Sequence, residues 1–69
     1  MNRYPIPQHH LTTAIESLHE LALRLEVEAA AYAQMNTHDS VLLADDRLEQ
    51  AGSMRKAAEY FTSLLEVQP

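Results

Sequence analysis

The feature that most constrains the fold is the near absence of helix-breaking residues from the interior of the chain. The only glycine is Gly52, and the three prolines, Pro5, Pro7 and Pro69, lie at the two ends. Glycine and proline are the residues that most often interrupt a helix. The interior therefore has almost nothing to prevent long helices, and we predict an all-α fold.

The apolar residues support this prediction because they recur with a helical period. Alternating steps of four and three residues form a heptad seam in the first half of the chain: Leu11, Ile15, Leu18, Ala22, Leu25, Ala29 and Tyr32. A second seam occupies the other half: Val41, Ala44, Leu48, Ala51, Met54, Ala58, Phe61 and Leu65. The polar run 36–40 between them contains turn formers. Two helices joined by one turn are predicted.

The expected order of segments makes one single-domain hairpin. We predict an arm over residues 1–7, a helix over about 8–36, a turn over 37–39 and a helix over about 40–66. A turn this short makes the helices antiparallel neighbours. Alanines near the turn should allow a closer approach there than at the termini, where the seam residues are bulkier.

The helix ends carry recognisable capping signals. The first helix starts either near Pro7 or at Thr13, because Thr13 and Glu16 have the spacing of a capping box. Asp39 or Ser40 is expected to cap the second helix.

The small size of the chain favours self-association. A 69-residue chain without cysteine buries a small core and has no disulfide to support it. We therefore expect two hairpins to pair as a homodimeric four-helix bundle. Gly52 costs about 1 kcal/mol relative to alanine inside a helix. It marks either the close approach of another backbone or a weak point.

The charge and the hydropathy pattern exclude several classes of function. Ten acidic residues against five basic ones give a net charge of −5, which leaves too few cations for binding nucleic acid. An acidic surface instead favours a partner protein with a basic surface. No apolar run approaches the roughly 20 residues of a membrane span. The first residues lack the apolar core of a secretory signal, so we expect a cytoplasmic protein without membrane contact.

No motif for catalysis, a metal or a cofactor stands out. Glu16 and His19 have the Glu-x-x-His spacing of di-iron bundles, but Glu16 should face solvent and no second such motif follows. A cysteine nucleophile and a glycine-rich phosphate loop are both missing. Asp45 and Asp46 are adjacent carboxylates, but a two-helix hairpin offers them no substrate pocket. We predict a protein that is not an enzyme, with no cofactor, metal or catalytic residues.

Two groups of outward residues are candidates for binding a partner. Acidic residues gather near the start of the second helix, where the simpler interpretation is a solvated face that complements the helix dipole. An apolar ridge on the first helix, formed by Leu23, Val27 and Ala30, is either a binding face, the dimer contact or a surface covered by the arm. The predicted partner-binding set is Leu23, Val27, Val41, Leu42, Asp45, Asp46, Glu49 and Tyr60.

Two stretches, MNRYPIPQHHLTTAIESLHELA and NTHDSVLLADD, carry a resemblance to a family. The chain resembles the small helical-hairpin proteins of temperate Pseudomonas phages, which are anti-quorum-sensing proteins and twitching inhibitors. This resemblance implies a dimer that acts by binding host proteins. The implied targets are a LuxR-type quorum-sensing regulator and the ATPase of type IV pilus assembly.

The leading hypothesis is therefore an inhibitor or adaptor that sequesters a larger cytoplasmic protein. The first alternative is a secretion-type co-chaperone, whose hairpin would hold an aggregation-prone subunit through apolar contacts. A second alternative is an RNA-binding hairpin dimer of the kind that regulates plasmid copy number. The net charge of −5 counts against this last hypothesis.

Overall fold

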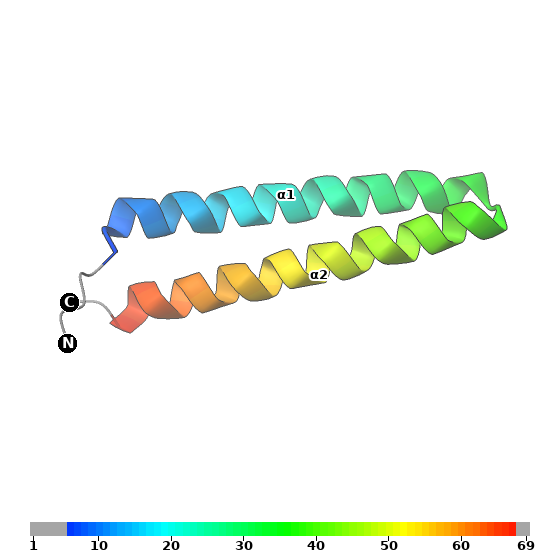
Figure 1. Ribbon diagram of the computed structural model, residues 1–69. Helices are drawn as coiled ribbons and strands as arrows, with labels where there is room; N and C mark the ends of the chain where they lie inside the picture. The colour runs from blue at the N-terminus through cyan, green and yellow to red at the C-terminus, as the bar shows by residue number, and fades with distance from the viewer. Residues whose placement is uncertain (1–5, 68–69) are drawn as a thin grey trace.

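The fold is a hairpin of two long helices. The computed structural model describes residues 6–67, in which α1 spans Gln8–Met35 and α2 spans His38–Val67. The helices run antiparallel and pack side by side along their length (Figure 1). The predicted all-α hairpin is thus confirmed. Residues 1–5 of the predicted arm lie outside the described residues.

Helix α1 begins directly after Pro7, so the earlier of the two predicted starts is correct. The carbonyl oxygen of Pro7 accepts hydrogen bonds from the backbone N–H groups of His10 and Leu11, at 3.0 and 3.2 Å. Thr13 is inside the helix, and its hydroxyl donates to the carbonyl oxygen of His9 at 2.8 Å. The capping box predicted at Thr13 is therefore wrong. Pro7 is the N-cap residue, with φ −54° and ψ 137°, and its carbonyl oxygen accepts the first hydrogen bonds of the helix.

The connection between the helices is shorter than the predicted turn at 37–39. Asn36 ends α1 in the left-handed conformation, with φ 53° and ψ 38°, and its N–H donates to the carbonyl oxygen of Ala33 at 3.3 Å. Asparagine tolerates this conformation better than most residues because its side chain is short and polar. Only Asn36 and Thr37 separate the two helices.

A reciprocal pair of hydrogen bonds caps the start of α2. The Ser40 backbone N–H donates to the Thr37 hydroxyl oxygen at 3.1 Å, and the Thr37 N–H donates to the Ser40 hydroxyl oxygen at 2.9 Å. This is the geometry of a capping box, with serine at the position that usually holds Glu or Gln. The N-cap residue is therefore Thr37, which was not predicted; of the two predicted residues, Ser40 takes part in the cap from the third position of the helix.

Alanines form most of the buried seam between the helices. The buried apolar residues of α1 all belong to its predicted seam, and those of α2 are alanines: Leu11, Ala22, Leu25 and Ala29, with Ala44, Ala51 and Ala58. Such short side chains let two helices approach closely. In Figure 1 the helices lie closest beside the connection and separate toward the termini, as the distribution of alanines predicts.

The first half of α2 is rotated relative to the predicted seam. Ser40 is only 4% exposed, whereas Val41 and Leu48, both predicted in the seam, are 43% and 52% exposed. The partly buried Arg47 takes the position expected for Leu48 and donates to Glu28 of α1 at 3.0 Å. Ser40 is held against the connection by the capping box. Ala44 and Ala51 stay buried as predicted, so the helix is turned by only part of the roughly 100° that separates successive residues. This rotation brings Ser40 and Arg47 inward and leaves Val41 and Leu48 at the edge of the seam.

Candidate interaction surface

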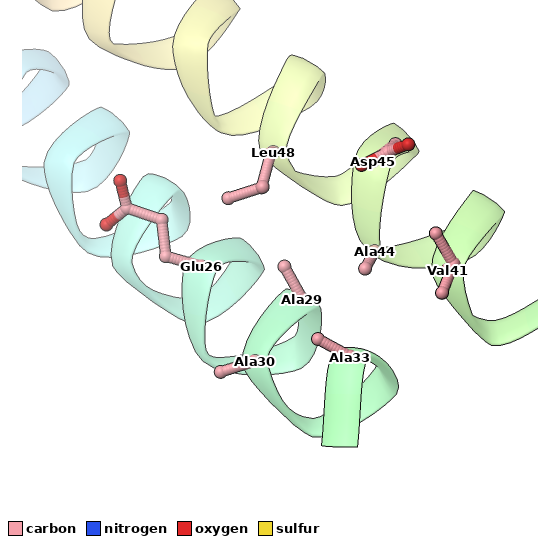
Figure 2. A pocket seen from close by; sticks show the side chains of 8 residues that line it. All are labelled: Glu26, Ala29, Ala30, Ala33, Val41, Ala44, Asp45 and Leu48. Carbon is pink, nitrogen blue, oxygen red and sulfur yellow. The ribbon is translucent and has the colours of Figure 1, made fainter. Parts of the chain in front are cut away.

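Val41 and Leu48 border a groove between the helices near the connection, which we name the loop groove. It has a volume of about 280 Å³, with apolar residues from both helices as its walls and carboxylates at its edges: Glu26, Ala29, Ala30, Ala33, Val41, Ala44, Asp45 and Leu48. Figure 2 shows Leu48 extending toward α1 while the Asp45 side chain points away from the groove. The groove exists because the alanine side chains between the helices are too short to fill the space there, and Val41 and Leu48 lie at its edge.

The ridge predicted on α1 is divided in the structure. Leu23 and Val27 are 58% and 63% exposed and border a shallow hollow with Arg24 and Glu28. Ala30, the third residue of that ridge, lines the loop groove instead. Leu23 and Val27 therefore form a separate apolar patch on α1.

The three predicted acidic residues do not form one patch. Asp45 borders the loop groove. Asp46 accepts hydrogen bonds from Arg47 Nη1 and Gln50 Nε2, each at 2.8 Å, so its charge is partly compensated. Glu49 is exposed, and within residues 6–67 neither Asp45 nor Glu49 takes part in an ion pair. The uncompensated charge is thus on Asp45 and Glu49.

The two remaining predicted residues lie apart from each other. Leu42 is 55% exposed beside the loop end of α2, next to the partly exposed Leu43. Tyr60 is 61% exposed in the last turns of α2, with its ring 5.7 Å from that of Phe61 in an edge-on arrangement. The structure therefore brings Val41 and Asp45 together at the loop groove and leaves Tyr60 near the opposite end.

Two ion pairs between the helices flank the seam. Arg55 donates to both carboxylate oxygens of Glu26, with Nη2 to Oε1 at 2.6 Å and Nε to Oε2 at 3.1 Å. These hydrogen bonds lower the pKa of the Glu26 carboxyl and raise the pKa of Arg55. Arg47 donates to Glu28, which raises the pKa of Arg47, and lies 5.9 Å from the Tyr32 ring centre. Because exposed ion pairs contribute little to stability, their main effect is to fix the register of the helices.

Apolar spacing does not reveal four surface or pairing residues: Leu48, Ala33, Glu26 and Arg55. Leu48 fits the apolar period so well that spacing alone places it in the seam. The Thr37–Ser40 spacing was the available signal, because a capping box there fixes which side of α2 faces α1. The Arg55–Glu26 pair requires the antiparallel register, which spacing within one helix does not give.

Other chemistry is sparse in the part of the chain that the structure describes. Between residues 6 and 67, no three His, Asp or Glu side chains lie close enough together to hold a metal ion. His19 Nδ1 is 3.4 Å from Arg55 Nη1, and both side chains lie at the edge of the seam. Neither α1 nor α2 combines the length and apolar character that crossing a membrane requires.

Comparison of the chain with protein families, with curated proteins and with solved structures gives no match.

Proposed function

We propose that this protein is a small, non-enzymatic binding protein that sequesters a larger host protein in the cytoplasm. The observation that carries the proposal is the exposure of large aliphatic side chains at the start of α2. Val41, Leu42 and Leu43 are 43%, 55% and 39% exposed, and Leu48, two turns after Val41, is 52% exposed. Several large aliphatic side chains exposed near one end of a helix are typical of protein interaction sites.

Charge supports a partner with a basic surface. The chain carries a net charge of −5, and Asp45 and Glu49 lie beside the exposed aliphatic residues. An apolar contact surrounded by uncompensated carboxylates is complementary to a surface with Lys or Arg around an apolar centre.

The sequence resemblance to phage hairpins suggests which partners to test first. We propose a LuxR-type quorum-sensing regulator, whose DNA-binding domain needs a basic surface, and the ATPase of type IV pilus assembly. Binding to a regulator would compete with its DNA, because both ligands are acidic.

The second candidate is a secretion-type co-chaperone. The exposure of Leu23 and Val27 on α1 favours it, because such hairpins hold an unfolded or aggregation-prone subunit through apolar contacts. In that function the apolar patch on α1 matters and the carboxylates of α2 do not.

The experiment that separates the two candidates is calorimetric titration of the hairpin into each purified partner. We expect Leu42→Ala, and separately Asp46→Lys with Glu49→Lys, to weaken binding at least tenfold without loss of helicity by circular dichroism. Glu59→Lys with Glu66→Lys is the matched control, since it also replaces two carboxylates by two lysines, at exposed positions near the end of α2. Loss of binding only on Leu23→Ala with Val27→Ala would favour the co-chaperone, and unchanged binding by all variants would exclude both surfaces.

A further inference from the structure

One face of α2 combines an apolar knob, a glycine and two opposite charges. Alternating steps of four and three residues place its members on a single side of the helix: Val41, Asp45, Leu48, Gly52 and Arg55. This side is the one that borders the loop groove, because its first three members line the groove and Arg55 pairs with Glu26, another lining residue. We name it the α2 stripe.

Gly52 has no explanation within the hairpin. The residue is exposed in the middle of α2 with a negative φ, and a Cβ atom built on it would meet no atom within 4 Å. Glycine at such a position costs about 1 kcal/mol of helix stability relative to alanine. A missing side chain is useful there only if something outside the hairpin approaches the backbone of α2 closely.

The stripe is complementary to itself when reversed. Leu48 and Gly52 lie equally far on either side of Gln50, and so do Asp45 and Arg55. Two antiparallel copies of α2 centred on Gln50 therefore place a leucine opposite a glycine and a carboxylate opposite a guanidinium, each twice. This is the property that a two-fold symmetric interface requires.

We infer that a second copy of the chain covers this face, with α2 antiparallel to α2 of the partner subunit about a two-fold axis at Gln50. Leu48 then packs over Gly52 of the partner subunit, and Asp45 pairs with Arg55 of the partner subunit. The two-fold axis runs across the width of the hairpin, parallel to its broad face and between the two copies. Each helix therefore packs on the same helix of the partner subunit, and the pair forms a four-helix bundle. This dimer covers Val41, Asp45 and Leu48, so a target would contact Leu42, Asp46 and Glu49, which lie on another side of α2.

Charge decides between this centring and the nearest alternative. A two-fold axis at the loop groove would place Asp45 against Asp45 of the partner subunit, and like charges in an interface are repulsive. Centring on Gln50 replaces that repulsion by two attractive pairs. Arg55 can pair with Glu26 and with Asp45 of the partner subunit at the same time. Glu26 accepts hydrogen bonds from Nε and Nη2 of Arg55, whereas Nη1 has only the 3.4 Å approach to His19. The Arg55 side chain is also 40% exposed.

The size of the face is sufficient for a stable dimer. The molecule measures 52 × 21 × 14 Å, so its broad face exceeds the roughly 800 Å² per subunit of a standard interface. Leu11 is the largest side chain that is fully buried in the described hairpin. A core that consists mostly of alanine is small even for this length, and pairing would add the burial that it lacks.

The matched test is a comparison of Leu48→Ala with Leu42→Ala by sedimentation equilibrium of the full chain. Both leucines lie on α2 with nearly equal exposure, 52% and 55%, but only Leu48 belongs to the stripe. We expect a wild-type dimer, a dissociation constant at least tenfold higher for Leu48→Ala, and an unchanged constant for Leu42→Ala. A monomeric wild type at about 100 µM would overturn the inference, as would equal effects of the two variants.

A charge exchange tests the register within that dimer. Asp45→Arg alone should dissociate the dimer, and adding Arg55→Asp in the same chain should restore at least half of the lost association. Asp46→Arg is the control, since Asp46 is outside the stripe and pairs with Arg47. Circular dichroism reports whether each variant stays helical, because Arg55→Asp also removes the pair with Glu26. The proposed pairing is wrong if Asp45→Arg leaves a tight dimer. It is also wrong if the double variant stays helical but regains none of the lost association, even though the wild type dimerises.

Discussion

The loop half and the open half of the hairpin use their large apolar side chains in opposite ways. In the open half six of these residues face the other helix and are buried or half-buried, and Tyr60 and Val67 are exposed; the six are Leu11, Ile15, Leu18, Phe61, Leu64 and Leu65. In the loop half the inward positions of α2 hold Ser40, Ala44 and Arg47, and the large aliphatic residues there are exposed. The difference indicates that the open half stabilises the hairpin, whereas the loop half leaves apolar surface for contacts with other molecules.

The largest loss of stability is expected when a large side chain is removed from the open half. Leu11→Ala should lower the free energy of unfolding by about 2–5 kcal/mol, because Leu11 is only 1% exposed and its loss leaves a cavity. Leu42→Ala in the loop half should change it by less than about 0.5 kcal/mol. Urea denaturation measures both. Equal losses of unfolding free energy in the two variants would mean that the two halves contribute equally to the stability of the hairpin.

A smaller effect is expected from overfilling the seam where the halves meet. Ala51 is 1% exposed and packs with Ala22 and Leu25. Ala51→Leu should therefore cost about 1–3 kcal/mol, because the added atoms force the helices apart. Ala31→Leu, at an exposed position of α1, is the control. A thermal midpoint for Ala51→Leu no lower than that of the control would contradict the close approach of the helices.

The connection contributes through its capping box. Thr37→Ala removes the hydroxyl that accepts the Ser40 N–H, and it should cost about 1 kcal/mol. The replacement should also loosen the rotation of α2 that keeps Val41 and Leu48 outward. Amide hydrogen exchange at the start of α2 measures this, with Thr62→Ala as the control far from the connection. Unchanged exchange rates would show that the seam sets the rotation without the cap.

The smallest effect concerns the ion pair between Arg55 and Glu26. The hydrogen bonds from Arg55 lower the pKa of Glu26 from its ordinary value of 4.5, so the folded state favours the carboxylate. This contribution to stability is present above pH 4.5 and is lost as the pH falls through the lowered pKa of the folded state. Glu26→Gln should remove that part of the acid dependence, whereas Glu66→Gln should not. Identical acid unfolding of the two variants would contradict the pairing.

The sequence predicted the fold well because periodicity and the scarcity of glycine and proline both act locally. The seam of α1 and the antiparallel hairpin followed from those two features. The rotation of α2 did not, since Val41 and Leu48 fit the apolar period better than Ser40 and Arg47. Which side faces inward depended on one hydrogen-bonded cap and on Arg47 reaching across to Glu28, 19 residues earlier. The loop groove arises from that rotation and was therefore not predictable from apolar spacing.

The most direct test of the proposed binding function is capture of a partner from bacterial lysate with folded, tagged hairpin. Mass spectrometry should identify one protein retained in stoichiometric amount by the wild type. The same protein should be lost with a Leu42→Ala, Asp46→Lys, Glu49→Lys variant of equal helicity. If the wild type retains nothing, or if the variant retains the same protein equally well, the hairpin does not act through the exposed loop half of α2.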